Sequence, residues 1–375
     1  MKRYKPVDFL CVVVFVGILL SFMLYLTLGI FLTSEKNIEE DAYPLGHSAA
    51  DDFRSYNALF YEDVRIRNNV RELDYKLFRH VENDEIIVGN GRWLFATNES
   101  GLSYNYLLDY IGGHGFSDAE SAKILASLEA KKALLAKRGA EFMVVVVPNS
   151  MTVYGEYVPS YLGDQSENTR LAVLESYLSD AGFDGFYNLT EAMREKMPGA
   201  YYFNNTENSL TALGAVRVYQ SLMSLMQKHA DTGEKILKQD EMNVTTRLTD
   251  GRSYAKRAGL ENIIRNVTIS FTGELQRYEL QKAGELLKNS NNTVTLADGN
   301  VITEFDAVLE YSTEWDKVQF MPLLSNTFRK VTYKSGYLFD ASLFEEGRKK
   351  IVIQLIHENE LELLLDPAFA QSFGK

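Results

Sequence analysis

Glu207, Ser209, Ser312 and His357 are the side chains whose types and positions best suit covalent chemistry. Glu207 and Ser209 stand two residues apart, just before a predicted helix that follows Thr211. An acid at that spacing from a histidine would form a catalytic pair, because the acid orients the imidazole and the imidazole takes the proton. A serine stands at the second position here, and a serine hydroxyl is no general base near neutral pH. The segment is therefore either an active site or the place of a former one.

An alternation of strands and helices must position these side chains. Continuous apolar runs predict strands buried on both faces at 141–148, 305–311 and 349–356. Strands that alternate with helices favour an α/β fold with a mostly parallel sheet between helices. Ligands of such sheets bind at the carboxyl ends of the strands. We therefore expect Glu207, Ser312 and His357 at that edge, with Ser312 within reach of residues 207–209.

The remaining elements follow from periodicity and turn residues. We predict helices at about 56–80, 117–139, 168–182, 188–197, 211–229, 273–288, from about 314, and after 356. Ser117 and Glu120 have the spacing of a capping box. Shorter strands are expected at 184–187, 201–203 and 266–271, and hairpins at 85–96 and 293–303, around Asn90-Gly91 and Asp298-Gly299. Residues 231–262 are polar and predict an irregular insertion.

Residues 9–32 carry no charge and predict a transmembrane helix, since a helix of that length spans about 36 Å. Basic residues precede it and acidic residues follow it, which predicts a cytoplasmic tail at 1–8 and an external remainder. We expect a tether at 33–55 and an extracytoplasmic domain at 56–375. The alternative is a cleaved signal peptide, but the apolar run is long for one and lacks a small-residue cleavage site.

Composition excludes several classes of protein. A formal net charge of −12 disfavours nucleic-acid binding. Cys11 is the only cysteine, so no intrachain disulfide can form. The five histidines lack metal-ligand spacing, and no phosphate-binding or dinucleotide-binding glycine motif is found. We expect neither a structural metal nor a cofactor.

Three stretches of the sequence resemble a known family: FYEDVRIRNNV at 60–70, IIVGNGRWLF at 86–95 and VVVVPNSMTVYGEYVP at 144–159. Over about residues 57–365 the chain resembles the alginate O-acetyltransferase family of the AlgJ/AlgX type, whose members are SGNH-hydrolase-like. Tyr154, Glu156, Tyr157 and Pro159 match a signature of that family, while Ser150 stands where the signature has lysine. The resemblance implies an SGNH-hydrolase-like domain on a bacterial cell membrane that acts in polysaccharide acetylation.

The resemblance also implies roles for site residues. The family takes its acid and histidine from an Asp-x-His-Trp segment and its nucleophile from a Gly-Asp-Ser turn. The corresponding positions here are Glu207, Ser209 and Leu210, and Glu310, Tyr311 and Ser312. The nucleophile is kept and the general base is lost. The resemblance therefore implies a catalytically impaired homologue that binds a cell-surface polysaccharide or a modification complex, such as one with a membrane-bound O-acyltransferase.

Other interpretations stay open. His357 could replace the missing base of an active acetyltransferase or acetylesterase, or it could be a hydrogen-bonded residue at a strand end. Glu207 also suits a helix entry, and Ser312 a turn or N-cap, without any catalysis. Trp315 could pack or stack on a sugar. A third possible function is that of an envelope structural protein.

Overall fold

The computed structural model describes residues 15–17, 20–21, 24, 64–98, 104–195, 200–227, 243–272, 291–295, 302, 305–325, 327–344 and 348–372. The chain divides into two compact units, residues 1–67 and 68–375. No helix among the described residues is long and apolar enough to cross a membrane. Most of the predicted segment 9–32 lies outside those residues, as does the predicted helix 273–288.

A six-stranded sheet forms the centre of the second unit, with strand order β4-β3-β10-β8-β9-β7. Its strands are β3 (Ala140–Val147), β4 (Phe186–Asn188), β7 (Asn291–Thr295), β8 (Asp306–Tyr311), β9 (Lys330–Ser335) and β10 (Lys350–His357). All neighbours pair in parallel except β7 with β9. The prediction of an α/β fold with a mostly parallel sheet is confirmed.

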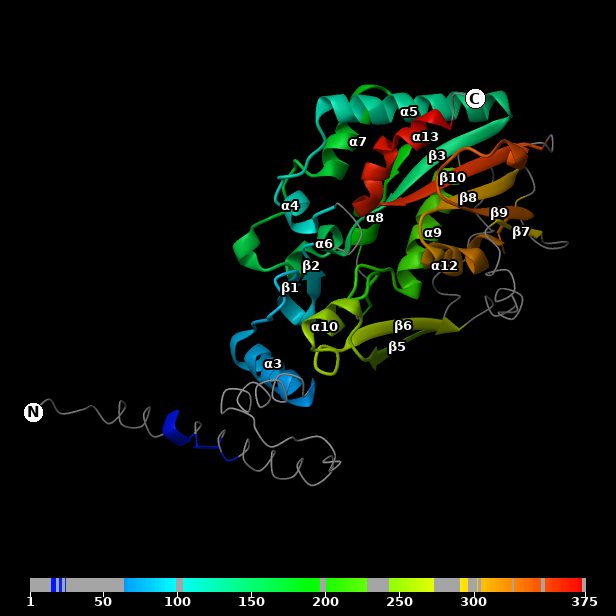
Figure 1. Cartoon of the computed structure of the whole chain (residues 1–375). Coiled ribbons are helices and arrows are strands. Elements are labelled where there is room, and N and C mark those ends of the chain that lie inside the picture. Colours follow the sequence, from blue (N-terminus) through cyan, green and yellow to red (C-terminus); the bar gives the residue numbers. More distant parts are fainter. Residues whose placement is uncertain are drawn as a thin grey trace, which may run out of the picture. The chain divides into compact units, whose positions relative to one another are not determined.

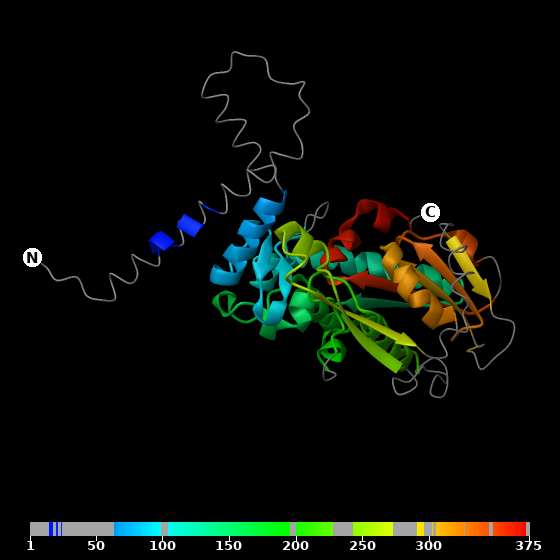
Figure 2. The same cartoon turned by 90° about the horizontal axis from the view of Figure 1, so that it is seen from below.

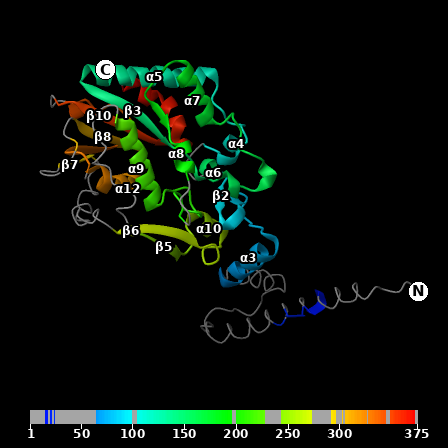
Figure 3. The same ribbon diagram turned by 180° about the vertical axis from the view of Figure 1, so that it is seen from behind.

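Both faces of the sheet are buried because apolar side chains of its central strands point to both sides. In β3, Phe142, Val144 and Val146 belong to one hydrophobic core, while Val145 and Val147 belong to the other. Helices α5 (Asp118–Lys137), α7 (Arg170–Asp180) and α13 (Pro367–Gln371) lie over the first face, and α9 (Ala212–Met226) and α12 (Glu314–Ser325) over the second, as Figures 1 and 3 show. The predicted capping box of α5 is present.

Smaller elements surround this sheet. They are α3 (Val64–Phe78), β1 (Ile86–Val88), η1 (Asn90–Arg92), β2 (Leu94–Ala96), α4 (Tyr106–Tyr110), α6 (Ser150–Val153), η2 (Gly155–Tyr157), η3 (Ser160–Leu162), α8 (Thr190–Arg194), η6 (Ala341–Phe344) and η7 (Glu358–Leu365). β1 and β2 form the hairpin predicted around Asn90-Gly91. The last predicted helix is a 3-10 helix, η7, followed by α13.

The predicted insertion is more regular than its sequence indicates. It contains β5 (Asn243–Thr249) and α10 (Ser253–Ala258), and β5 pairs antiparallel with β6 (Asn266–Thr272). This hairpin lies outside the six-stranded sheet (Figure 2). The strand predicted at 266–271 is therefore present as β6, but it pairs with β5 and not with the central sheet.

Two further predictions are wrong. Residues 201–203 form no strand, because Thr211 N donates to Tyr202 O and the backbone is bonded within its own loop. The predicted hairpin at 293–303 is not formed. Its first strand, β7, pairs with β9, and Ile302 forms a bridge with Phe328. β9 was not predicted at all.

Candidate active site

Residues 203–210 form a closed loop at the entrance to α9. An antiparallel bridge joins Phe203 to Leu210, and Asn204 N donates to Ser209 O at 2.9 Å. Thr211 is the N-cap of α9 and its hydroxyl accepts from Gly214 N. A Cβ at Gly214 would lie 2.0 Å from Tyr202 O, so only glycine allows the helix to approach the loop this closely. The predicted helix entry is confirmed.

Glu207 and Ser209 are hydrogen-bonded to each other within this loop. Ser209 Oγ donates to Glu207 Oε2 at 2.8 Å and accepts from Asn204 Nδ2 at 2.9 Å. Arg252 Nη1 lies 3.1 Å from the same carboxylate oxygen. The Glu207 carboxylate therefore accepts from the Ser209 hydroxyl and pairs with Arg252. Position 209, which holds histidine in the related motif, has a serine hydroxyl and no basic proton acceptor.

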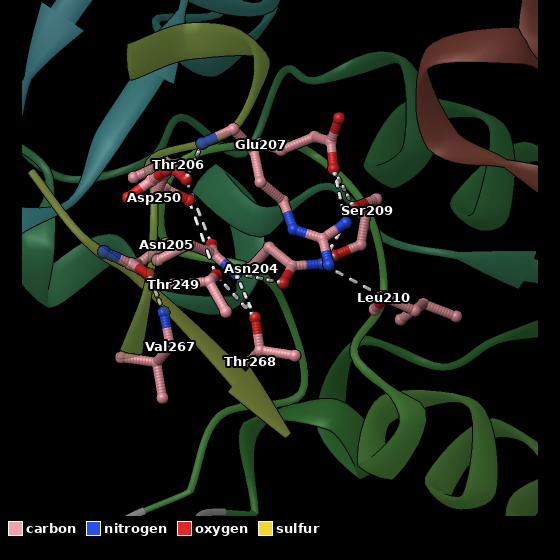
Figure 4. Close-up of polar contacts among 12 residues, drawn as sticks. Asn204, Asn205, Thr206, Glu207, Ser209, Leu210, Thr249, Asp250, Val267 and Thr268 are labelled. Carbon is pink, nitrogen blue, oxygen red and sulfur yellow. Dashed lines mark hydrogen bonds and ion pairs between the residues drawn. The ribbon is translucent and has the colours of Figure 1, made fainter. Parts of the chain in front are cut away.

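The β5–β6 hairpin fixes the loop from outside (Figure 4). Buried Asn266 donates to Asn204 Oδ1 at 2.9 Å and accepts from Thr206 Oγ1 at 3.0 Å. Asn205 Oδ1 accepts from Val267 N at 2.9 Å. Asn204, Asn205 and Thr206 are thus hydrogen-bonded to the hairpin. Arg252, which lies between β5 and β6, pairs with Glu207. No sequence signal predicted this, because the contact joins residues about sixty positions apart.

Ser312 follows β8 directly, as predicted, at the carboxyl end of the strand. Its hydroxyl donates to Glu360 Oε2 at 2.5 Å. A carboxylate in that position could in principle accept the serine proton, but an ordinary carboxylic acid is far more acidic than imidazole and is a weaker base. The hydroxyl is therefore oriented by an acid that sequence reasoning did not select.

His357 ends β10 and is bonded to the helix that follows Ser312. His357 Nε2 lies 2.9 Å from Asp316 Oδ1, and both side chains are largely buried. His357 also begins η7, where its backbone N donates to Glu360 Oε2 at 3.4 Å. Ser312 and His357 thus share Glu360 as a hydrogen-bond partner.

The loop with Glu207 and Ser209 lies at the same end of the sheet as Ser312 and His357. Asn208 Oδ1 accepts from Ser150 N just after β3, and Gln319 of α12 donates to Leu210 O at 3.1 Å. The loop therefore spans from the end of β3 to the helix after β8. Among the described residues, no hydrogen bond joins Ser312 to residues 207–209, so the segments are neighbours without direct polar contact between the candidate residues.

A pocket of about 180 Å³ lies between the loop, α12 and β6. Trp315 is 66% exposed at its edge. The pocket is lined by Asn204, Ser209, Arg252, Thr268, Trp315 and Gln319, among others. Amides, hydroxyls, an arginine and an exposed aromatic ring are the groups that bind sugars, since they combine hydrogen bonding with an apolar face.

The two residues before Ser312 point into the cores and not toward a substrate. Tyr311 is fully buried, and Glu310 pairs with buried Lys131 of α5. Lys131 also donates to Gln354 at 2.7 Å and Tyr337 O at 3.1 Å. Burial lowers the pKa of Lys131 to about 8, against the opposing effect of Glu310. The position that the resemblance assigns to glycine has become part of a structural ion pair.

A second buried acid, Glu358, follows His357 directly. It accepts from Asn149 N at 2.6 Å and from Thr152 Oγ1 at 2.8 Å, so it ties η7 to the end of β3. Burial raises its pKa to about 7, and the nearby carboxylate of Asp109 adds to that rise. Sequence reasoning missed Glu358 because nothing in IHENEL distinguishes its two acids, Glu358 and Glu360.

Of the other residues that were missed, two could have been found. Asp316 lies four residues after Ser312, one helical turn along α12, and Glu360 lies three residues after His357, the spacing of a capping box. No group of three or more His, Cys, Asp or Glu side chains in the described chain could hold a metal ion.

The parallel sheet between helices carries polar loops at its carboxyl edge, where such sheets bind ligands. The family model "SGNH hydrolase-like domain, acetyltransferase AlgX" matches residues 86–320, and the chain belongs to this family. The predicted resemblance is confirmed.

One solved structure supports the fold, and a second is reported for its similarity. Bacillus cereus PatB1 with a sulfonyl adduct is 12% identical, covers 77% of this chain and 98% of its own, and has a TM-score of 0.51. The O-acetyltransferase domain of Pseudomonas putida AlgJ is also 12% identical over 77% and 98%, with a TM-score of 0.45. No curated protein matches the chain significantly.

Proposed function

We propose that this chain is a catalytically impaired member of the AlgX family that binds a cell-surface polysaccharide during its acetylation or export. The observation that carries the proposal is the pairing of Glu207 with Ser209 and Arg252, in the place where the related motif has an acid and a histidine. The Ser312 hydroxyl donates to the carboxylate of Glu360, a weaker base than imidazole. Loss of one member of a catalytic unit removes most of the benefit of the others.

The proposal includes a membrane anchor at residues 9–32, with residues 1–8 in the cytoplasm and the family domain outside the cell membrane of a bacterium. The uncharged run and the basic residues before it support this arrangement. In that place the domain meets envelope polysaccharide and a modification complex, for which a membrane-bound O-acyltransferase is the expected partner class.

Binding is expected at the pocket beside Trp315. The full-length chain, purified in mild detergent, should bind polysaccharide from the cell envelope in affinity electrophoresis. Trp315→Ala should weaken that binding at least tenfold, because an exposed stacking face is lost, whereas Ser312→Ala should not change it. Equal binding by wild type and Trp315→Ala would exclude this pocket.

One observation favours a second candidate function, an active acetylesterase or acetyltransferase. His357 is paired with Asp316 and shares Glu360 with Ser312, so a small rearrangement would bring a base and its orienting acid to the hydroxyl. In that case His357→Ala and Ser312→Ala would each abolish hydrolysis of an acetyl ester. Under the first proposal neither substitution changes the rate.

A further inference from the structure

The outer face of α3 is apolar and exposed. Val70, Leu73 and Leu77 have the spacing of one helix face and are 47%, 54% and 64% exposed. Phe78, at the end of the helix, is 72% exposed. The opposite face carries Tyr75, which is buried. We call the four exposed side chains the α3 stripe.

The inner face of α3 already supplies the packing that the fold needs. Tyr75 belongs to a hydrophobic core cluster with Ile86, Leu94 and Tyr254, which come from the β1–β2 hairpin and α10. A helix on the surface of a soluble domain normally presents polar residues on its outer face. An apolar outer face on a helix whose inner face is already buried therefore indicates a second apolar environment.

The charges around the stripe suit a lipid surface. Residues 70–80 hold three basic side chains, Arg71, Lys76 and Arg79, and two acidic ones, Glu72 and Asp74, so with His80 neutral their net charge is +1 in a chain of −12. The long stems of lysine and arginine can lie along apolar surface while their charged ends reach lipid headgroups. Basic residues are also attracted to the anionic headgroups of a bilayer.

Most acids near the stripe have a basic partner. The contacts are Lys76–Glu72, His80–Asp74, Arg71–Glu82 and Arg257–Glu85. Asp84 is exposed, but it follows the end of α3 by six residues and lies outside the helix that carries the stripe. Arg79, directly after α3, lies over the ring of Tyr75, 5.0 Å from its centroid. Both acids of α3 therefore have a polar partner, and a base follows the stripe.

The place of α3 in the chain brings a bilayer within its reach. The uncharged run of the proposed anchor ends at residue 32 and α3 begins at Val64, so residues 33–63 join them. A flexible chain of that length spans about 30 Å on average. Contact between the stripe and the bilayer that holds the anchor is then intramolecular, and a few apolar side chains suffice for it.

A bilayer suits the stripe better than a second copy of the chain or a permanent protein partner. A stable protein interface buries about 800 Å² and about 20–30 residues on each side. Four side chains on one helix are far fewer than that. Shallow insertion of an apolar face between lipid headgroups needs no partner of complementary shape.

We infer that α3 is an interfacial helix whose stripe, Val70, Leu73, Leu77 and Phe78, inserts into the outer leaflet of the bilayer. The inference rests on the proposed function for the anchor, and it adds an orientation of the family domain. Residues 70–78 of α3 lie at the opposite end of the second unit from α5, as Figures 1 and 3 show. With α3 on the lipid surface, α5 faces away from it.

The test uses the full-length chain reconstituted in vesicles of phosphatidylcholine and phosphatidylglycerol. Cys11→Ser removes the only natural cysteine, and Leu77→Cys then carries a nitrobenzoxadiazole dye. Lipids brominated on their acyl chains quench the dye on contact, and we expect its emission to fall at least about twofold. The same dye at Ala126→Cys, an exposed position of α5, should not be quenched.

A change of the stripe should remove the signal. Val70→Gln with Leu73→Gln should abolish most of the quenching at position 77, because buried amides resist insertion. Urea unfolding should stay as in wild type, since both side chains are exposed. The matched control, Leu338→Gln with Leu363→Gln, replaces side chains that are 48% and 41% exposed elsewhere and should leave the quenching unchanged.

Flotation of the vesicles separates this inference from the anchor. A chain that floats with the vesicles but shows no quenching at position 77, or equal quenching in the double glutamine variant, would overturn the inference and leave the anchor intact. A chain that does not float would overturn the anchor and the inference with it. A dye at position 77 that is shielded in detergent and becomes exposed on dilution would show that a second copy covers the stripe, and this would also overturn the inference.

Discussion

Arg252 Nη1 lies 3.1 Å from Glu207 Oε2, the same oxygen to which the Ser209 hydroxyl donates. The guanidinium group thus meets the acid that would otherwise orient a base. Arg252 comes from the segment between β5 and β6, and the hairpin of these strands is held on the loop by buried asparagines. The loop that the proposal identifies as a former site is therefore held by a set of structural contacts.

The hydrogen bonds of Asn266 and the ion pair of Arg252 should contribute unequally to the free energy of unfolding. Asn266→Ala should lower the free energy of unfolding by about 2–3 kcal/mol, because it leaves the buried polar groups of Asn204 and Thr206 without a partner. Arg252→Ala should cost less than about 1 kcal/mol, since its ion pair is partly exposed. Urea unfolding of both variants measures the difference. Equal costs would contradict the ranking of the asparagine contacts above the ion pair.

Restoring the glycine of the Gly-Asp-Ser turn should damage the fold. Glu310→Gly removes the carboxylate partner of buried Lys131, and breaking a buried pair from one side costs about 3–5 kcal/mol. Adding Lys131→Met should recover part of that loss, as measured by thermal unfolding, because buried Lys334, 3.5 Å from Glu310, also loses that partner. If the double variant were no more stable than Glu310→Gly, the loss would come from the glycine and not from the charge.

Glu358 should make stability depend on pH. Its pKa in the folded protein is about 7, above the unfolded value of 4.5, so the folded state holds the proton more tightly. The stability that this proton contributes is fully present below about pH 4.5 and is lost as the pH rises through 7, up to about 3 kcal/mol. Glu358→Gln, which cannot lose a proton, should gain stability relative to wild type between pH 5 and 8. Parallel pH profiles of unfolding for the two proteins would contradict this.

The membrane anchor can be tested by topology. A reporter active only outside the cytoplasm, fused after residue 375, should be active, and the mature N-terminus should lie at or near Met1. Activity of a cytoplasmic reporter at the same point would reverse the orientation. An N-terminus near residue 34 would show a cleaved signal peptide.

The sequence predicted the sheet better than it predicted the site. The strands β3, β8 and β10 are mostly apolar, so their burial on both faces could be predicted from local composition. β9 (KVTYKS) contains two lysines and was missed, and buried Lys334 lies 3.5 Å from Glu310 of the neighbouring strand and donates to Gly336 O at 2.8 Å. Such a charge cannot be told from a surface charge until the sheet is assembled.

The site shows the same limit. Ser312 and His357 were placed correctly at strand ends, because a strand and its following residue are local features. Their actual partners, Glu360 and Asp316, and the Arg252 partner of Glu207, depend on how separate loops meet. The roles of Glu207, Ser209, Ser312 and His357 in catalysis stay predictions.

The most direct test of the central claim is hydrolysis of a generic acetyl ester by the full-length chain, compared with Ser312→Ala. A positioned general base contributes about a hundred- to ten-thousand-fold to such reactions. We predict a rate near background for wild type, unchanged in Ser312→Ala, and a measurable rise in Glu207→Asp with Ser209→His only if the pocket still admits the ester. Robust hydrolysis by wild type that Ser312→Ala abolishes would contradict the account.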